Sequence, residues 1–155
     1  MKVEFINPFL SSLSEVLQQI VSMDVTFGKP ELVSSPTESP GVTIIVGITG
    51  DLKGQVFYNF SPQMALDFAR AMMMGMQVDE LDELAKSAIS EMANITMGNV
   101  ATKLSEAGFT VDLTPPSIIV GSEKLMITSE IGPVLKIPMS TQAGEFSVLV
   151  GLKPK

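Results

Sequence analysis

The alternation of hydrophobic and polar positions predicts one long helix over residues 79 to 108, around which the rest of the chain is organised. Hydrophobic side chains recur there at the three- and four-residue spacing of a single helical face. An acidic run opens the segment, where the positive end of a helix favours carboxylates, and Gly108 closes it. The expected buried face consists of Leu81, Ala85, Ile89, Met92, Thr96 and Val100.

The opposite face of this helix carries Ser87, Glu91, Asn94 and Gly98, which we call the polar line. Their spacings of four, three and four residues place them in one row on the solvent side. One carboxylate and one amide between two small residues would let another protein come close. Exposed Glu and Asn are also ordinary on solvated helices, so the spacing alone leaves both interpretations open.

Helical spacing also predicts a helix over residues 5 to 22, with Ile20 on its hydrophobic face. Ser61 followed by Pro62 predicts the start of another helix, which ends near Met74. The methionine-rich run 71–76 is consistent with an adaptable binding surface, but methionines more often fill gaps in the core, which is what we expect here. Residues 34–41 are typical of a loop, and residues 24–34 are expected to form a strand with a break. Two hairpins are expected, over residues 42–60 and 132–152. Short strands are expected at 110–114, 117–121 and 124–129.

An internal repeat relates the two longest predicted helices. Each helix is followed by strand material, a proline and a hairpin, which indicates two related halves. The matching residues, each pair separated by 76 positions, are Ser11 and Ser87, Glu15 and Glu91, Gln18 and Asn94, and Pro40 and Pro116.

The first-helix copy of the polar line is expected to be degenerate. Gln18 keeps the amide of Asn94 but has one more methylene, and catalytic positioning is sensitive to displacements of about 1 Å. Glu15 and Gln18 would then form a weak or inactive site. Simple solvation of the first helix explains the same two residues equally well.

Composition narrows the chemistry that the chain can perform. Its 155 residues, 45% of them hydrophobic, fit one domain over residues 1–155. A net charge of −7 with ten Lys and Arg argues against a nucleic-acid partner. The chain has no Cys and no His, which excludes Ser-His-Asp and Cys-His nucleophile systems. It shows neither a secretory signal nor a membrane-spanning segment, so we expect a cytoplasmic protein that does not bind membranes.

The polar line, with Pro116 following Asn94 by 22 residues, resembles the signature of the CheC, CheX and FliY family of bacterial chemotaxis phosphatases. The flanking sequence LDELAKSAISEMANITMGNVATKL, followed by VDLTPPSIIVG, is similar to CheX-type members in particular. The upstream segments GITGDLKGQVFYNFS and AMMMGM are similar as well. The resemblance covers nearly the whole chain.

This resemblance implies an enzyme that hydrolyses the phosphoaspartate of a CheY-like response regulator in chemotaxis or related two-component signalling. It implies catalytic roles for Glu91 and Asn94 and contact with the phosphorylated partner at Ser87 and Gly98. It further implies no cofactor in this chain, a Mg²⁺ ion in the partner's receiver domain, and a homodimer whose sheet extends through the strands around 42–60 and 132–152.

The fold expected from pattern and resemblance together is α/β, of the CheC-like kind. A largely antiparallel sheet would carry the two long helices on one face, with an internal pseudo-two-fold repeat. One alternative is a non-catalytic CheC-like docking module that binds a receiver domain or a flagellar switch component. Another is a small-molecule-binding or purely structural domain, which would show a deep apolar pocket and a buried Asn94.

Overall fold

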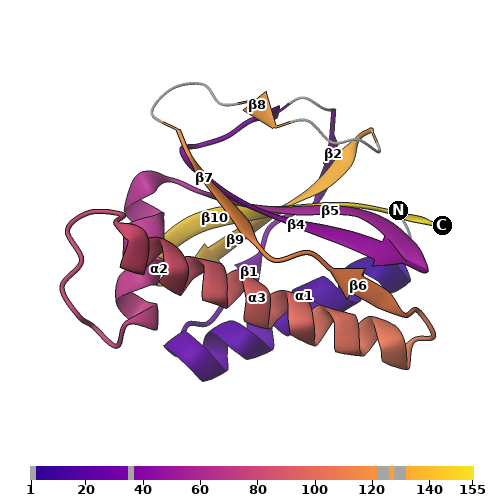
Figure 1. The fold of residues 1–155 in the computed structure, drawn as a ribbon, viewed down its shortest axis with the longest axis horizontal. Coiled ribbons are helices and arrows are strands. Elements are labelled where there is room, and N and C mark those ends of the chain that lie inside the picture. The colour runs from indigo at the N-terminus through magenta and orange to yellow at the C-terminus, as the bar shows by residue number, and fades with distance from the viewer. Residues whose placement is uncertain (1–2, 35–36, 122–125, 128–131) are drawn as a thin grey trace.

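Helices lie beneath a curved sheet in the computed structural model, which describes residues 3–34, 37–121, 126–127 and 132–155 (Figure 1). The helices are α1 (Val3–Val21), α2 (Pro62–Met72) and α3 (Glu83–Glu106). The strands are β1 (Thr26–Phe27), β2 (Glu31–Val33), β3 (Thr37–Glu38), β4 (Val42–Gly50), β5 (Leu52–Phe60), β6 (Val111–Leu113), β7 (Ser117–Val120), β8 (Met126–Ile127), β9 (Val134–Thr141) and β10 (Gly144–Pro154).

The sheet is built from two long hairpins, β4–β5 and β9–β10, joined where β5 pairs with β10. Its strand order is β1-β9-β10-β5-β4-β6, with β2 also paired to β9 and β7 also paired to β4, all antiparallel. A Cβ atom at Gly54 would collide with the carbonyl oxygen of Gly151, so this close approach of β5 and β10 requires glycine. The predicted antiparallel α/β fold is confirmed.

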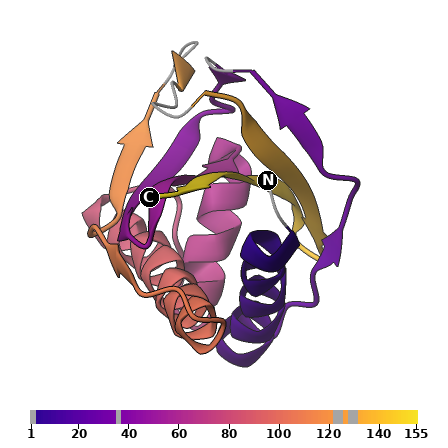
Figure 2. The same ribbon diagram turned by 90° about the vertical axis from the view of Figure 1, so that its right-hand side faces the viewer.

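All three helices cover the same face of the sheet, which curves over them (Figure 2). The predicted pair of long helices is therefore correct, and α2 adds a third beside them. Five of the six residues expected on the buried face of α3 are buried, while Leu81 lies before the helix and is half-buried. The largest side chains enclosed between helices and sheet include Phe9, Leu13, Leu17, Ile44, Phe60, Phe68, Ile89 and Met92.

Several local predictions were wrong. Helix α3 begins at Glu83 rather than near Asp79, because Asp82 acts as its N-cap and accepts a hydrogen bond from the Ala85 amide at 2.9 Å. Met74 and Met76 are exposed rather than in the core, since α2 has already ended at Met72.

Two further predicted boundaries changed. The expected loop 34–41 contains β3, which pairs with β8 to form a separate two-stranded sheet. The expected strand 124–129 is described only at β8, and its other residues lie outside the described ones. Ile20, expected on the buried face of α1, is exposed near the C-terminal end of that helix.

The expected route to a dimer does not fit the sheet. Strands β4, β5, β9 and β10 each have a neighbouring strand of this chain on both sides. A second copy therefore cannot add a strand to the sheet at those paired positions. The outer strands and the face away from the helices are the surfaces left for a second copy.

A buried hydrogen bond connects α3 to the centre of the sheet. The Tyr58 hydroxyl lies 2.5 Å from Thr96 Oγ1, and Thr96 Oγ1 donates to the Ala93 carbonyl at 3.0 Å. Tyr58 is therefore the donor to Thr96. Burial raises the pKa of Tyr58 well above its ordinary value, although the bond to Thr96 acts in the other direction. The phenol stays neutral at physiological pH.

We predict that Thr96→Val destabilises the protein more than Tyr58→Phe does. The first change leaves a buried hydroxyl without its acceptor, at about 1–3 kcal/mol, whereas the second leaves Thr96 bonded to Ala93, at about 0.5–1.5 kcal/mol. Urea unfolding of both variants checks the order. A larger loss for Tyr58→Phe would show that the phenol hydroxyl has another acceptor.

Candidate functional site

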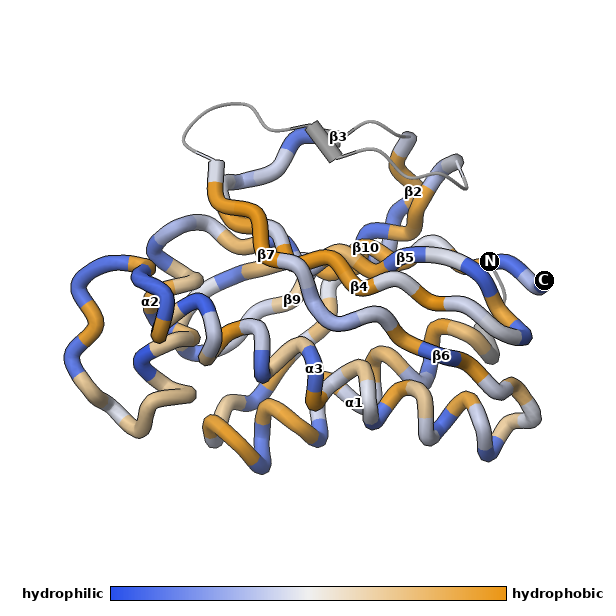
Figure 3. Tube along the Cα trace, viewed as in Figure 1, coloured by the Kyte–Doolittle hydropathy of each residue, from blue (hydrophilic) through white to orange (hydrophobic). Residues whose placement is uncertain are grey.

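The polar line runs along the outer side of α3, as the sequence predicts. Ser87, Glu91, Asn94 and Gly98 are all exposed. At 1.5 Å per residue the row is about 16 Å long. Hydrophilic and hydrophobic residues alternate along α3 in Figure 3, which is what a helix covered on one side shows.

Burial of one face of α3 determines which of its residues face the solvent. The buried residues of α3 repeat at helical spacing along its whole length, and α3 packs against both α1 and α2. A helix held in this way cannot rotate without exposing its core face. The residues that fix it are Ala85, Ile89, Met92, Ala93, Thr96, Met97, Val100 and Leu104.

The side chains of Glu91 and Asn94 have no hydrogen-bond or ion-pair partner among the residues that the structure describes. Another acid of α3 behaves differently, because Glu83 pairs with Lys86 at 3.3 Å. An acid and an amide one turn apart are therefore both available to groups outside this chain. The exposure of Asn94 also contradicts the purely structural alternative, which required it to be buried.

Helix α1 lies antiparallel beside α3. The ring of Phe5, near the start of α1, is 5.1 Å from the ring of Phe109, just after α3. Further along, the Ser12 hydroxyl donates to Asn99 Oδ1 at 3.0 Å. As the numbering rises along α1 it falls along α3, so the C-terminal end of α1 comes to the level of Asn94.

The copy of the site on α1 is occupied by a lysine from α3. Lys103 Nζ lies 2.8 Å from Glu15 Oε1 and donates to Ser11 Oγ, also at 2.8 Å. Gln18 is exposed. Glu15 is thus engaged by its own chain, whereas its counterpart Glu91 is not.

Unequal helix lengths explain the difference between the two copies. The 76-residue offset maps Val21, the last residue of α1, onto position 97 (21 + 76), but α3 continues for nine more residues to Glu106. Those additional turns carry Asn99 and Lys103, which reach across to α1. Sequence reasoning missed this contact, because it depends on which helix extends beyond the other after packing.

A hollow of about 320 Å³ begins beside Gly98, one turn after Asn94. A Cβ atom placed at Gly98 would have nothing within 4 Å, so no group of this chain requires glycine there. The absence of a side chain opens α3 to a partner's surface at this point. The hollow is lined by Ile95, Gly98, Asn99, Thr102, Lys103 and Glu106.

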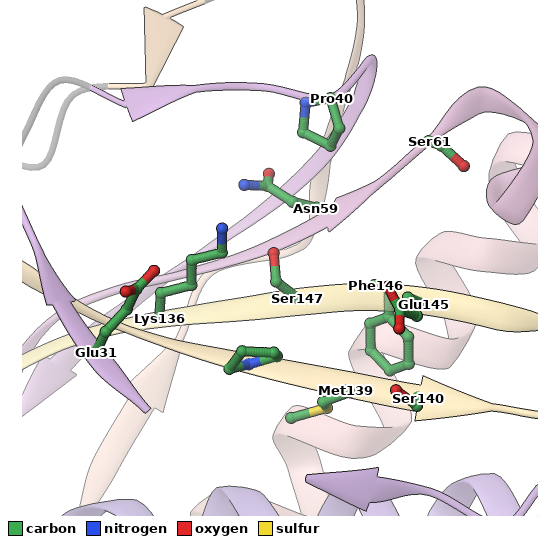
Figure 4. Close-up of a pocket in the computed structure, with 11 residues that line it drawn as sticks. Glu31, Pro40, Asn59, Ser61, Lys136, Met139, Ser140, Glu145, Phe146 and Ser147 are labelled. Atoms are coloured by element: carbon green, nitrogen blue, oxygen red, sulfur yellow. The ribbon is translucent and has the colours of Figure 1, made fainter. Parts of the chain in front are cut away.

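A second hollow, of about 330 Å³, lies on the face of the sheet away from the helices (Figure 4). Most of its lining residues are polar or charged, and they carry charges of both signs, including Glu31 and Lys136. It is unlike the deep apolar pocket expected of a small-molecule-binding domain. No residue of α3 lines it, so it is separate from the polar line.

Two further searches bear on the class of site. Within the described ranges, no three His, Cys, Asp or Glu side chains lie close enough together to hold a metal ion. None of the helices in that part of the chain is both long and apolar enough to cross a bilayer.

Comparison with known proteins agrees with this geometry. The family described as chemotaxis phosphatase CheX matches residues 42–140. CheY-P phosphatase CheX of Thermotoga maritima is 38% identical over 145 residues, which covers 94% of this chain and 92% of that protein. The crystal structure of a chemotaxis protein CheX from Desulfovibrio desulfuricans has a TM-score of 0.86 and 29% identity, covering 97% of this chain and 100% of the other. A CheX-CheY-BeF3-Mg²⁺ complex from Borrelia burgdorferi gives 0.78 and 29%, covering 98% and 99%.

We predict that Gly98→Ala stabilises the fold by about 0.5–1 kcal/mol. Glycine within a helix is less favourable than alanine by about this amount, and, among the described residues, the added methyl group has no atom within 4 Å apart from those of its chain neighbours and the adjacent helix backbone. Urea unfolding measures the change. A loss of stability would show that Gly98 is needed within the molecule rather than for a partner.

Proposed function

Because the chain belongs to the CheX family of chemotaxis phosphatases, we propose that it hydrolyses the phosphoaspartate of a CheY-like response regulator in the cytoplasm. The observation that carries the proposal is the pair of Glu91 and Asn94 on the outer side of α3, whose side chains bond to none of the residues that the structure describes. An acid and an amide held on a fixed helix, with open space at Gly98, suit a site completed by another protein.

The reaction requires few chemical contributions from this chain. A water molecule attacks the phosphorus of the acyl phosphate, the bond between phosphorus and the aspartate oxygen breaks, and inorganic phosphate leaves the restored carboxylate. The acyl phosphate is already activated, and the regulator's receiver domain is expected to supply Mg²⁺ in its own acidic pocket. The phosphatase then has to position the water and hold the regulator. Neither task requires His or Cys.

Asn94 is the residue that we assign to positioning the water. Its amide offers both a donor and an acceptor, so it can orient a water molecule without exchanging a proton. The side chain projects from the middle of α3, where burial of the inner face fixes the backbone beneath it. In this role Asn94 enters the receiver's active site and aligns the water with the phosphorus.

Glu91 would pair with the lysine of the receiver's active site, one turn along from Asn94. Its carboxylate has no partner among the described residues, so docking does not have to break an internal ion pair. A charge-assisted contact of this kind fixes the partner's orientation as well as adding affinity.

Ser87 and Gly98 would act by their small size at the two ends of the polar line. A large side chain at either position would lift α3 away from the receiver. The hollow beside Gly98 adds room for a side chain of the partner. Pro116 is half-buried immediately before β7 and is better explained as shaping the entry to that strand.

A homodimer is part of the same proposal. Exposed hydrophobic side chains on the outer strands give a second copy somewhere to bind. Phe27 of β1, Leu32 of β2, and Ile119 and Val120 of β7 are the candidates. The polar line on α3 would stay open in such a dimer.

We predict that Asn94→Ala lowers the stimulated rate of dephosphorylation by roughly 10²-fold or more, because misplacing the water costs that much. The fold should be unaffected, since Asn94 is exposed and unpaired. The measurement is the decay of radiolabelled phospho-receiver. Gln18→Ala, the matching amide on α1, is the control and should leave the rate unchanged. Equal decay with Asn94→Ala and wild type would favour the docking-module alternative.

We predict that Glu91→Ala weakens binding of the phosphorylated receiver and slows turnover, by roughly 10-fold to 100-fold in kcat/KM. Titration with the receiver in its beryllofluoride-bound form, which mimics the phosphorylated state, separates affinity from rate. Glu15→Ala is the matched control, because Glu15 is already paired with Lys103. Unchanged affinity in Glu91→Ala would remove the ion pair from the mechanism.

A further inference from the structure

Three hydrophobic side chains are exposed around the start of α3. Met74 is 95% exposed, Met76 58% and Leu84 61%. We call them the Met-Leu patch. All three fall within eleven consecutive residues (74 to 84), between the end of α2 and the first turn of α3. Burying hydrophobic side chains is energetically favourable, so several large ones exposed in one short segment indicate a surface that binds a partner.

The segment that presents the patch is held in place. Val78 is buried in the core, and its carbonyl accepts a hydrogen bond from Arg70 Nε at 2.9 Å. The Arg70 carbonyl in turn accepts from the Gly75 amide at 2.8 Å. Met74 adopts φ = 57°, a left-handed conformation that side chains other than glycine seldom take. Exposure of the methionines is therefore built into the folded backbone.

One member of the patch, Leu84, lies on α3 in line with the polar line. Leu84 precedes Ser87 by three residues and Glu91 by seven, spacings that place it on the same side of α3. It lies ten residues from Asn94, or about 15 Å along the helix. A standard protein interface buries about 800 Å² on each partner, equivalent to a disc of about 16 Å radius. A partner centred on Asn94 would therefore reach Leu84.

We propose that the Met-Leu patch is a second contact for the same receiver domain, and this inference rests on the proposed function. The matching surface of the receiver would be hydrophobic with Lys or Arg at its edge, because Asp79 and Glu80 are exposed beside the patch. Methionine side chains adapt to irregular partner surfaces, which suits a contact away from the reacting groups.

The remaining large exposed hydrophobic residues belong to other elements of the fold. Among the described residues they are Ile20, at the end of α1, and four on the strands β1, β2 and β7. Leu32 on β2 is 68% exposed, comparable with Leu84, yet belongs to the opposite side of the molecule (Figure 1). Leu32 belongs to the surface proposed above for a second copy of this chain.

A contact 15 Å from the chemistry should act on binding and not on the chemical step. Such a contact is made equally in the ground state and the transition state, so its loss raises KM and leaves kcat unchanged. Loss of Asn94 should do the opposite. The two roles are thus separable by kinetics.

The test uses the full chain and a CheY-like receiver whose dephosphorylation the wild-type chain accelerates. Affinity is measured by titration with that receiver bound to beryllofluoride and Mg²⁺, and kcat and KM with the phosphorylated form. We expect Leu84→Ser and the double variant Met74→Ser with Met76→Ser each to raise Kd and KM roughly tenfold. The value of kcat should stay within about twofold, and Leu84→Met should restore binding.

The outcomes separate this inference from the proposed function. Kd and KM within about twofold of wild type in both patch variants would overturn the second contact, as would a fall in kcat at unchanged Kd. Weakened binding in the patch variants, together with an Asn94→Ala protein that remains fully active, would keep the contact and reject the catalytic assignment. If no receiver binds the wild-type chain, the second contact is wrong as well.

Discussion

One-sided burial of α3 is the constraint on which the rest of the structure depends. Its inner residues are enclosed by the sheet and by α1 and α2, and the Tyr58–Thr96 hydrogen bond connects it to β5. Glu91 and Asn94 are therefore positioned through the backbone alone, without hydrogen bonds of their own. Side chains supported in this way stay free to pair with another protein's groups.

The same packing makes the two halves of the repeat unequal. Antiparallel contact between α1 and α3 would treat both copies of the polar residues alike if the helices had equal lengths. The additional turns of α3 instead bring Lys103 to Glu15, whereas α1 ends too early to cover Glu91. Under the proposed function, the longer side chain of Gln18 and the ion pair of Glu15 would each weaken activity at this copy.

Periodicity was sufficient to predict the most important element. The buried and exposed faces of α3 follow from three- and four-residue spacings, because one side of a helix must meet the core. The Lys103–Glu15 contact could not be predicted, since residues 88 positions apart meet only after packing. The exposed Met74 was missed for another reason: composition favours burial of methionine, and only the folded backbone shows that the chain turns outward after α2.

A site that contributes positioning alone has to obtain its selectivity elsewhere. An acid and an amide would suit the conserved chemistry of any phosphorylated receiver, so Glu91 and Asn94 by themselves cannot distinguish one regulator from another. Discrimination is a difference of affinities, and affinity comes from surface beyond the reacting groups. The exposed hydrophobic residues at the start of α3 are placed to supply it, close enough to share the interface and far enough to leave the water undisturbed.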